Sequence, residues 1–278
     1  MNTDIKSKFD EIEIKNSNNG LTLGDKQKQY EKILDFNYPE NYPVIIRLDG
    51  KSFSKRTKSW KLKKPFDSAF TQCMNAACQL LFKELQNVQF IWCGSDEISI
   101  VLENDKPEGL YSRRLSKLLS ISASIATVGF NQEARKQKLN IDDYPAYFDA
   151  RMTVLPNKEE VFKNILFRQN DCIRNSISQY ADMYYSNKEL HKKTSNEKIE
   201  MMLKKGFDWE NDAPPVMKYG FILSKIYSIF DLNTKKYIDS VEELDNSINY
   251  EELGQYIRTG FSISTEKITK DNIMKLIN

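Results

Sequence analysis

The sequence contains a single histidine, His191, and this scarcity excludes several kinds of catalytic site. A zinc site built on several histidines is ruled out, and a Ser-His-Asp triad would depend entirely on this one residue. His191 lies in a lysine-rich polar stretch, where a surface position is the simpler interpretation. Acid-base chemistry must therefore rest mainly on carboxylates, lysines or a metal ion.

Cysteine pairs and long apolar runs are also missing. The four cysteines, Cys73, Cys78, Cys93 and Cys172, contain no C-x-x-C pair, and we expect reduced thiols in the core. No apolar run reaches the roughly 18 residues that a membrane span needs, and the N-terminus is too polar for a signal peptide. We expect a soluble protein without membrane association, located in the cytoplasm, with an organelle left open.

The chain has little net charge, +2 from 41 basic and 39 acidic residues. A nucleic-acid binder often carries a large positive excess, so the total neither supports nor excludes RNA, and an RNA footprint would be a local patch. Basic residues cluster at 51–64 and at Lys192, Lys193, Lys204 and Lys205. Taken alone, each cluster is most simply solvated surface.

Apolar patterning predicts an α+β fold. With 40% hydrophobic residues the chain can form one large domain. Strands are predicted at 43–48, 88–92, 98–102 and 146–155, helices at 24–36, 68–85, 111–130, 158–185 and 197–205, and a hairpin pairs 217–230 with 235–240. The β-α-β-β-α-β order is that of a ferredoxin-like antiparallel sheet with flanking helices, the plan of polymerase and cyclase palms. We expect a flexible polar arm at 1–24, a palm-like catalytic domain at 25–160, and a helical and hairpin extension at 161–278 packed on it as one structural unit.

Two aspartates are predicted to meet at one end of this sheet. The first and third strands are central neighbours in the ferredoxin-like plan; Asp49 ends the first, and Asp96 occupies the hairpin tip that begins the third. Facing carboxylates repel unless a cation lies between them, and hard oxygen ligands select magnesium. The pattern predicts a metal site that binds a triphosphate. An ordinary Asp-Gly turn and a polar hairpin tip without any metal would give the same sequence pattern.

The neighbours of the two aspartates have less certain roles. Gly50 lets the backbone approach phosphate closely, and the amides of Lys51, Ser52 and Phe53 could cradle it. Glu97 would share the site only if the turn breaks strand alternation, because adjacent strand residues point to opposite faces.

Several sequence blocks resemble those of the tRNA-His guanylyltransferase family, in the family's order. The blocks are Arg47-Leu48-Asp49-Gly50-Lys51-Ser52-Phe53, Lys64-Pro65, Ser95-Asp96-Glu97-Ile98-Ser99, Ser112-Arg113-Arg114-Leu115-Ser116-Lys117, Phe148-Asp149-Ala150-Arg151 and Arg168-Gln169-Asn170-Asp171-Cys172. The segment 170–180, with Lys188-Glu189-Leu190-His191, is especially similar to the Thg1-like branch. The resemblance covers about residues 43–200 of the chain.

The resemblance implies a magnesium-dependent nucleotidyltransferase that adds nucleotides to the 5′ end of tRNA in the 3′-to-5′ direction. A 5′-monophosphate is first activated with ATP, and the 3′-hydroxyl of an incoming nucleotide, GTP or another triphosphate, then attacks the activated end. By position, Asp49, Asp96 and the Gly50 carbonyl would hold two Mg²⁺ ions with Glu97 in support. Triphosphates would be bound by Lys64, Ser95, Arg114 and Lys117 together with the loop Gly50, Lys51, Ser52 and Phe53, and RNA by Arg151, Arg174, Asn175 and Lys198. The family is typically homotetrameric.

The chain departs from the family pattern at two places that bear on its substrates. Eukaryotic guanylyltransferases have His-Ile-Asn-Asn after Asp-Cys, where this chain has Ile173-Arg174-Asn175-Ser176, and Gly94 stands where the family often has glutamine. The first departure favours template-dependent repair of truncated tRNA 5′ ends over addition of G−1 to tRNA-His, which stays the alternative. More remote alternatives are a nucleotide cyclase, with the same palm and acid pair, and a non-catalytic RNA-binding module.

Overall fold

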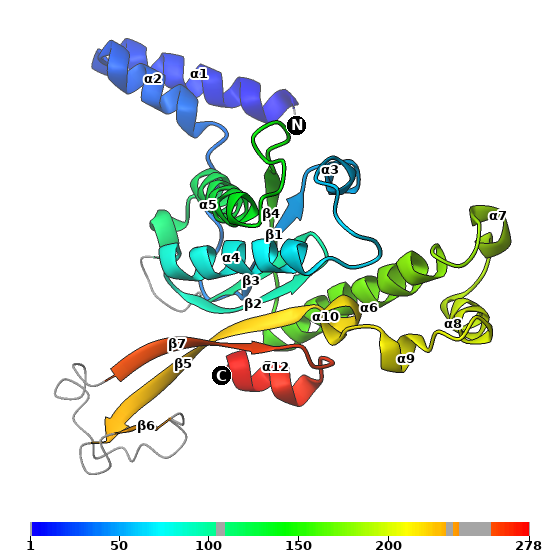
Figure 1. Ribbon diagram of the computed structural model, residues 1–278. Helices are drawn as coiled ribbons and strands as arrows, with labels where there is room; N and C mark the ends of the chain where they lie inside the picture. The colour runs from blue at the N-terminus through cyan, green and yellow to red at the C-terminus, as the bar shows by residue number, and fades with distance from the viewer. Residues whose placement is uncertain (1, 104–108, 232–235, 239–256, 278) are drawn as a thin grey trace.

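One antiparallel sheet with helices on both faces forms the centre of the molecule (Figure 1). The computed structural model describes residues 2–103, 109–231, 236–238 and 257–277. In this described part the strands are β1 (Val44–Gly50), β2 (Val88–Gly94), β3 (Glu97–Leu102), β4 (Phe148–Val154), β5 (Phe221–Asp231), β6 (Lys236–Ile238) and β7 (Ile257–Ser264). They are ordered β4-β1-β3-β2-β5-β6, with β7 on the other edge of β5, and all pairs are antiparallel.

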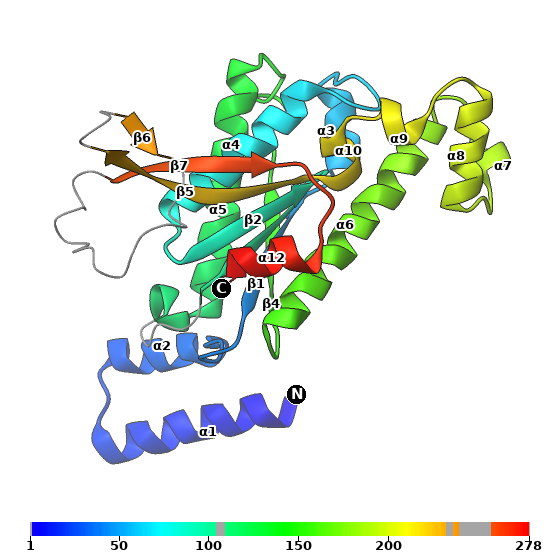
Figure 2. The ribbon, with the colours of Figure 1, turned by 90° about the horizontal axis from the view of Figure 1, so that it is seen from below.

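The first four strands confirm the predicted ferredoxin-like palm. Their order, β4-β1-β3-β2, makes β1 and β3 central neighbours, and α4 (Ser68–Glu84) and α5 (Leu115–Lys136) lie together over one face (Figure 2). Strand alternation explains the layers: Ile46 and Leu48 of β1 join the core beneath α4 and α5. Ile45 faces the other side and packs in the core of α6 (Lys158–Ala181) and α12 (Lys270–Ile277).

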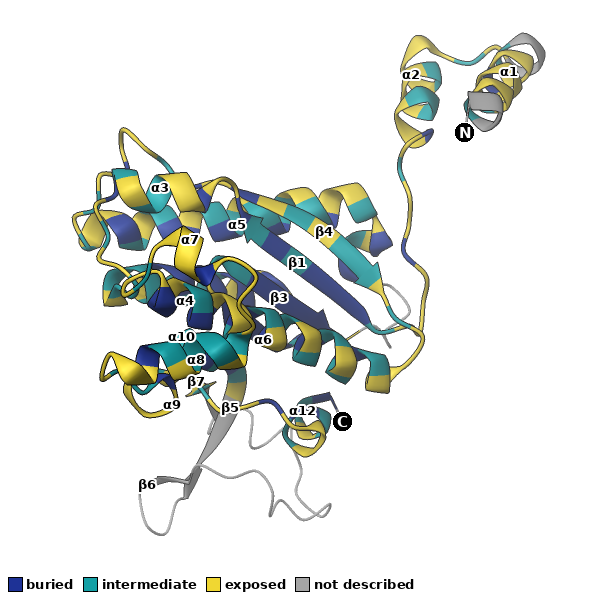
Figure 3. Ribbon diagram, turned by 90° about the vertical axis from the view of Figure 1, so that its right-hand side faces the viewer, coloured by how far each residue is buried: buried dark blue, intermediate teal, exposed yellow. Residues whose placement is uncertain are grey.

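The N-terminal segment, for which a flexible polar arm at 1–24 is predicted, contains helical structure that the sequence pattern does not predict; its flexibility stays a prediction. It forms α1 (Asn2–Asn19) and the start of α2 (Leu23–Lys32), and the two helices stand away from the sheet (Figure 3). Glu13 accepts hydrogen bonds from Lys26 and Tyr30, and Phe9 packs edge-on against Tyr30 at 5.9 Å. Three apolar residues of α1, Ile5, Phe9 and Ile12, recur at helical spacing, a stripe too short to stand out among the polar residues.

The C-terminal extension contributes strands to the same sheet instead of forming a separate layer. β5 pairs with β2 along residues 221–224, and α6 begins at Lys158, so the predicted boundary at 160 falls within its first turn. The predicted hairpin is confirmed by the pairing of β5 with β6, but residues 217–219 belong to α10 (Pro215–Tyr219), and 232–235, 239 and 240 lie outside the described residues.

The remaining helices are short: α3 (Phe53–Ser59), α7 (Asn187–Leu190), α8 (Ser195–Lys204) and α9 (Trp209–Asp212), with a 3-10 turn at Leu110–Arg113 before α5. The helix predicted at 111–130 therefore begins later, at Leu115, and the one predicted at 158–185 ends at Ala181. Among the described helices, none combines the length and the apolarity of a membrane span.

Candidate active site

The end of β1 and the β2–β3 hairpin are bonded directly to each other. The Gly50 amide donates to the Asp96 carbonyl at 3.1 Å, and the Lys51 amide donates to the Tyr147 carbonyl at 2.9 Å. Asp49 lies opposite Glu97 of β3 on one side and Asp149 of β4 on the other. The loop after β1 is thus fixed from both sides, and Asp49 and Asp96 lie at the same end of the sheet, as predicted.

The pKa of the Asp96 carboxyl is shifted by its surroundings. Burial raises the pKa of the Asp96 carboxyl above its ordinary value, and the negative charge of Asp49 raises it further. A hydrogen bond from Ser95 acts in the opposite direction but does not cancel the rise. A cation between the two carboxylates would remove this penalty.

The oxygen atoms at this end of the sheet fit magnesium better than a metal held entirely by protein. Within the described residues no group of three or more His, Cys, Asp or Glu side chains could enclose a metal ion. Mg²⁺ characteristically uses one or two carboxylates and completes its shell with water and substrate phosphates. Asp49, Asp96 and the Gly50 carbonyl provide such a partial set.

Glu97 is bound to two arginines instead of to the aspartates. Nη1 of Arg47 donates to Glu97 Oε2 at 3.0 Å, and Nε of Arg168 lies 2.9 Å from Glu97 Oε1 as an ion pair. Burial raises the pKa of Glu97, while Arg168 and Arg47 counteract the rise. Glu97 shares a face with Asp49 because the two are ladder partners, so no break in alternation is needed; Asp96 is the residue in the turn. Glu97 therefore positions the strand ends and the two arginines.

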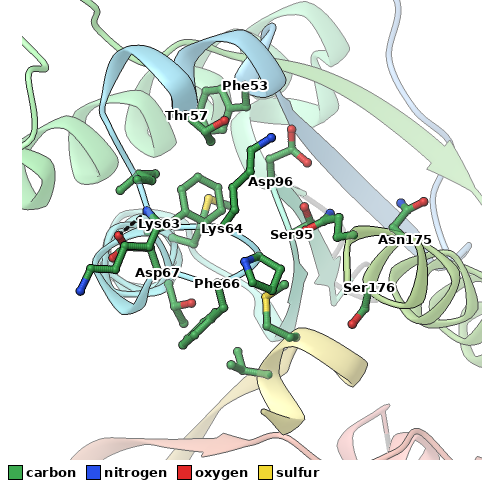
Figure 4. A pocket seen from close by; sticks show the side chains of 18 of the residues that line it. Phe53, Thr57, Lys63, Lys64, Phe66, Asp67, Ser95, Asp96, Asn175 and Ser176 are labelled. Carbon is green, nitrogen blue, oxygen red and sulfur yellow. Dashed lines mark hydrogen bonds between the residues drawn. The ribbon is translucent and has the colours of Figure 1, made fainter. Parts of the chain in front are cut away.

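A cavity of about 600 Å³ opens beside Asp96 (Figure 4). One wall comes from α3, the following loop and α4, and includes Lys64, whose side chain reaches toward Asp96. The other wall comes from α6 and α10, where Asn175 and Ser176 lie across from the loop. Ser95 and Asp96 lie between the walls, and the volume suits a nucleotide.

The loop after β1 is shaped by an aromatic cluster. Phe53, which is 2% exposed, packs against Trp60, Phe130 and Phe148 with ring centroids 5.2–5.3 Å away. A Cβ on Gly50 would lie 2.5 Å from the Phe53 ring, which is why glycine is needed there. The Gly50 and Lys51 amides are already bonded to carbonyls, so of the predicted cradle only the Ser52 and Phe53 amides, at the start of α3, can face a phosphate.

Two predicted triphosphate ligands, Arg114 and Lys117, are not brought to this site. Arg114 bridges Asn37 just before β1 and pairs with Asp35 at 2.7 Å, while the Lys117 ammonium lies over the Tyr111 ring. Asp49 is at the far end of β1, and a strand of seven residues spans roughly 20 Å. Within one chain the two residues therefore lie away from Asp49 and Asp96, and their contact with a nucleotide triphosphate stays a prediction.

The predicted RNA contacts fall in different surroundings. Arg151 pairs with Asp149 at 2.9 Å on the exposed edge strand, and Arg174 pairs with Asp171. Asn175 is exposed on the cavity wall, whereas Lys198 donates to the Ser178 hydroxyl at 3.0 Å and ties α8 to α6. RNA binding stays a prediction for all four residues.

Comparisons with known proteins agree with this geometry. Residues 24–156 match the family described as Thg1, tRNAHis guanylyltransferase. An uncharacterized protein of Acanthamoeba polyphaga mimivirus is 30% identical over 230 residues, covering 73% of this chain and 77% of that protein. The tRNA(His) guanylyltransferase of Debaryomyces hansenii is 29% identical over 217 residues, covering 72% and 79%. The structure of a bacterial tRNA(HIS) guanylyltransferase (Thg1)-like protein in complex with ATP superposes with a TM-score of 0.73 at 29% identity, covering 92% of this chain and 99% of that one.

The chain belongs to the Thg1 superfamily. The recognition of this family and the predicted enzyme class, a nucleotidyltransferase, are both confirmed.

Sequence reasoning missed most of the cavity wall opposite Lys64. Gln179 of α6, Asp182 directly after the last residue of α6, and Met217 of α10 line that wall. Asn175, Gln179 and Asp182 are spaced four and three residues apart, a polar stripe that places them on one helix face. That stripe could have been found, but the packing of α6 against the hairpin could not.

The structure explains why this Thg1-superfamily chain has glycine at position 94. A Cβ there would lie 2.5 and 2.6 Å from the Cη2 and Cζ2 atoms of Trp92 and 3.2 Å from the Cys172 sulfur. The Trp92 indole donates to the Tyr219 carbonyl at 3.2 Å, which fixes the ring in that space. The tryptophan thus occupies the room that a side chain at 94 needs.

Restoring the common family residue should therefore destabilise this protein. We expect Gly94→Gln to lower the free energy of unfolding by about 1–3 kcal/mol, because the buried ring must move. Urea denaturation of this variant and of Gly94→Gln combined with Trp92→Phe measures the effect, and the smaller ring should recover part of the loss. Equal losses in both variants would show that Trp92 is not the obstacle.

Proposed function

We propose that this protein adds nucleotides to the 5′ end of tRNA in the 3′-to-5′ direction, and that it repairs truncated 5′ ends against a template. The observation that carries the proposal is that Asp96 lines the cavity together with Lys64 and Ser95, while Asp49 is close enough for its charge to raise the pKa of Asp96. This arrangement joins a cation site of hard oxygen atoms to a space of nucleotide size with a positive charge on its wall.

The residues at the candidate site have three proposed roles: holding metal ions, binding the triphosphate and positioning the strands. Asp49, Asp96 and the Gly50 carbonyl would hold one or two magnesium ions, which when bound neutralise the charge that develops on the reacting phosphates. Lys64 would contact the triphosphate from the α3 side, and Ser95 and the first amides of α3 would bind its remaining oxygens. Glu97, fixed by Arg47 and Arg168, would hold β1 and β3 in register beneath the reacting groups.

The reaction has two displacements at phosphorus. The 5′-monophosphate of the RNA attacks the α-phosphorus of ATP, so that pyrophosphate leaves and an adenylylated end forms. The 3′-hydroxyl of the incoming nucleotide then attacks the 5′-phosphorus, its proton is lost and AMP leaves. A 5′-triphosphorylated end enters at the second step with pyrophosphate as leaving group. Structures of a bacterial Thg1-like protein in complex with ATP and with GTP support nucleoside triphosphates as substrates, and activation is assigned to ATP.

Repair is preferred to obligatory G−1 addition because of the α6 sequence. Ile173, Arg174, Asn175 and Ser176 replace the His-Ile-Asn-Asn run of eukaryotic guanylyltransferases, and Asn175 and Ser176 line the cavity. Addition of GTP to tRNA-His is the second candidate, supported by the curated relatives of that name. We also propose a homotetramer in the cytoplasm.

The test compares two RNAs labelled internally, a tRNA lacking its first nucleotide and full-length tRNA-His. Each is incubated with magnesium, ATP and all four nucleotides, using wild-type protein and Asp96→Asn. Growth of the truncated tRNA by the nucleotide that matches the template, lost in the variant, is the expected result. Growth of tRNA-His alone would move the assignment to G−1 addition, and a cyclic nucleotide formed without RNA would replace it with the cyclase alternative.

A further inference from the structure

The segment that follows the catalytic loop is the most one-sidedly charged part of the chain. Between Gly50 and Asp67 there are seven basic residues and no acidic one: Lys51, Lys55, Arg56, Lys58, Lys61, Lys63 and Lys64. Lys63 and Lys64 follow α3 and line the cavity, as does Lys58. The five residues on and around α3, Lys51, Lys55, Arg56, Lys58 and Lys61, are named here the α3 basic surface.

The positive charges of the α3 basic surface are not neutralised by ion pairs with any of the described residues. In the described part of the chain, none of its five side chains forms an ion pair, whereas Arg47, Arg114, Arg151, Arg168 and Arg174 all do. The nearest acid in sequence, Asp67, accepts hydrogen bonds from the Lys63 and Ala69 amides instead. Such a concentration of unpaired cations attracts a polyanion.

The fold holds this surface rigidly and turns it outward. Phe53 and Trp60, at 2% and 3% exposure, anchor α3 in the core, and the Trp60 indole donates to the Tyr144 carbonyl at 2.7 Å. Lys51, Lys55, Lys58 and Lys61 are exposed. The Arg56 guanidinium lies 5.7 Å from the centroid of the half-exposed Tyr147 ring, so an aromatic ring instead of an acid holds it in place.

The α3 basic surface also lies close to Asp49 and Asp96. Tyr147 precedes Phe148, the ladder partner of Gly50, and α3 starts three residues after Gly50 (Figure 1). An RNA whose 5′ end lies between Asp49 and Asp96 must carry its sugar–phosphate chain away from two negative charges. α3 offers that chain its first positive surface.

We infer that the α3 basic surface binds the sugar–phosphate backbone of the RNA substrate close to its 5′ end. This inference rests on the proposed function. The contacts are made to phosphates and not to base edges, so they position the RNA without selecting its sequence.

A second basic cluster provides a matched control. Residues 186–205 on α7 and α8 carry six lysines but also Glu189, Glu197 and Glu200. Glu197 pairs with Lys193 at 2.9 Å, and Glu189 caps α7. Charge there is partly balanced, and Lys188, Lys192 and Lys204 are as exposed as the residues of the α3 basic surface.

The experiment measures binding of 5′-truncated tRNA by fluorescence anisotropy, without nucleotides, between 50 and 200 mM salt. It compares wild type, Lys55→Gln/Arg56→Gln/Lys61→Gln, and Lys188→Gln/Lys192→Gln/Lys204→Gln. The α3 variant should bind tRNA about 10- to 100-fold more weakly and lower the slope of log K against log salt by roughly 2–3, since each lost phosphate contact removes just under one unit. ATP affinity should stay within about twofold of wild type, which verifies the fold. The α7–α8 variant should change the slope by less than about one unit.

The outcomes separate the inference from the proposed function. If wild type extends tRNA while the α3 variant keeps the wild-type affinity and salt slope, the inference is overturned and the proposed function stands. An α7–α8 variant that loses as much as the α3 variant would also overturn it. If wild type binds no tRNA at all, the proposed function fails and the inference with it.

Discussion

Asp96→Asn is expected to lower nucleotide addition by on the order of 10³-fold or more, because it removes one of the two carboxylates at the candidate cation site. Asparagine has the same shape and keeps a neutral oxygen, so the hairpin should not rearrange. The loss should appear in the rate at saturating RNA and nucleotide. Single-turnover extension of truncated tRNA in excess magnesium measures it.

The same substitution is expected to stabilise the protein in the absence of metal. Burial and Asp49 raise the pKa of Asp96 in the folded state, so its charged form costs free energy that a neutral amide does not. The folded state then binds the proton more tightly than the unfolded state, and wild-type stability falls as pH rises from the unfolded pKa, about 3.9, through the raised folded value. At neutral pH we expect Asp96→Asn to gain about 1 kcal/mol, a gain that disappears below about pH 4.

Magnesium should reverse the order of stability, because it binds and stabilises wild type but not the variant. Urea denaturation with and without Mg²⁺ checks this point. Asp142→Asn is the matched control, since this exposed carboxylate pairs with Arg135 and should change neither activity nor the response to magnesium. If Asp96→Asn kept more than a tenth of the activity, Asp96 would not be a catalytic ligand.

The palm was predictable because its signals are local and agree with one another. Val44 to Leu48 and Ile98 to Leu102 are apolar runs with one polar residue each, Arg47 and Ser99, and the β-α-β-β-α-β order leaves few arrangements of the strands. Asp49 and Asp96 could be predicted as a pair because each lies next to an end of a predicted strand. α1 was not predicted, because its three apolar residues bury little area. A helix that packs against only one neighbour shows a weak apolar periodicity.

Topology also shows why Arg114 and Lys117 lie away from Asp49 within one chain. β4 runs antiparallel to β1, so the start of β4 lies beside Asp49 and the end of α5 lies near it; the Phe148 amide indeed donates to Thr127. The beginning of α5 must then lie at the opposite end of the sheet. The family resemblance supplied the residue types without this constraint. The α6 wall of the cavity was beyond sequence reasoning, because it depends on how a helix crosses a face whose contacts are far apart in the chain.

Gly220→Ala is expected to lower the free energy of unfolding by about 3–5 kcal/mol. Gly220 lies where the C-terminal extension packs against the β2–β3 hairpin that carries Asp96. Gly220 has φ 70° and ψ −156°, a backbone region that is almost restricted to glycine. A Cβ there would lie 2.2 Å from the Cys93 carbonyl oxygen and 3.1 Å from the Gly94 Cα. Neither neighbour can yield, since both are backbone atoms of β2 immediately before Asp96.

The residues on both sides of Gly220 are held in place by hydrogen bonds and strand pairing. The Tyr219 carbonyl accepts hydrogen bonds from the Trp92 indole at 3.2 Å and from Gln169 of α6 at 3.0 Å, and Phe221 begins the pairing of β5 with Cys93. A shift of Gly220 would therefore move β2, α6 and the hairpin together. For this reason nucleotide addition should fall even at temperatures where the variant stays folded.

Gly206→Ala separates backbone strain from the steric clash. Gly206 also has a positive φ, 84°, but a Cβ there would meet nothing within 4 Å, so only the conformational cost of about 1–2 kcal/mol applies. Urea denaturation of both variants should show Gly220→Ala to be less stable by at least about 2 kcal/mol. Equal stabilities would mean that β2 can move away from the extension, and that the C-terminal third of the chain does not hold Asp96 in place.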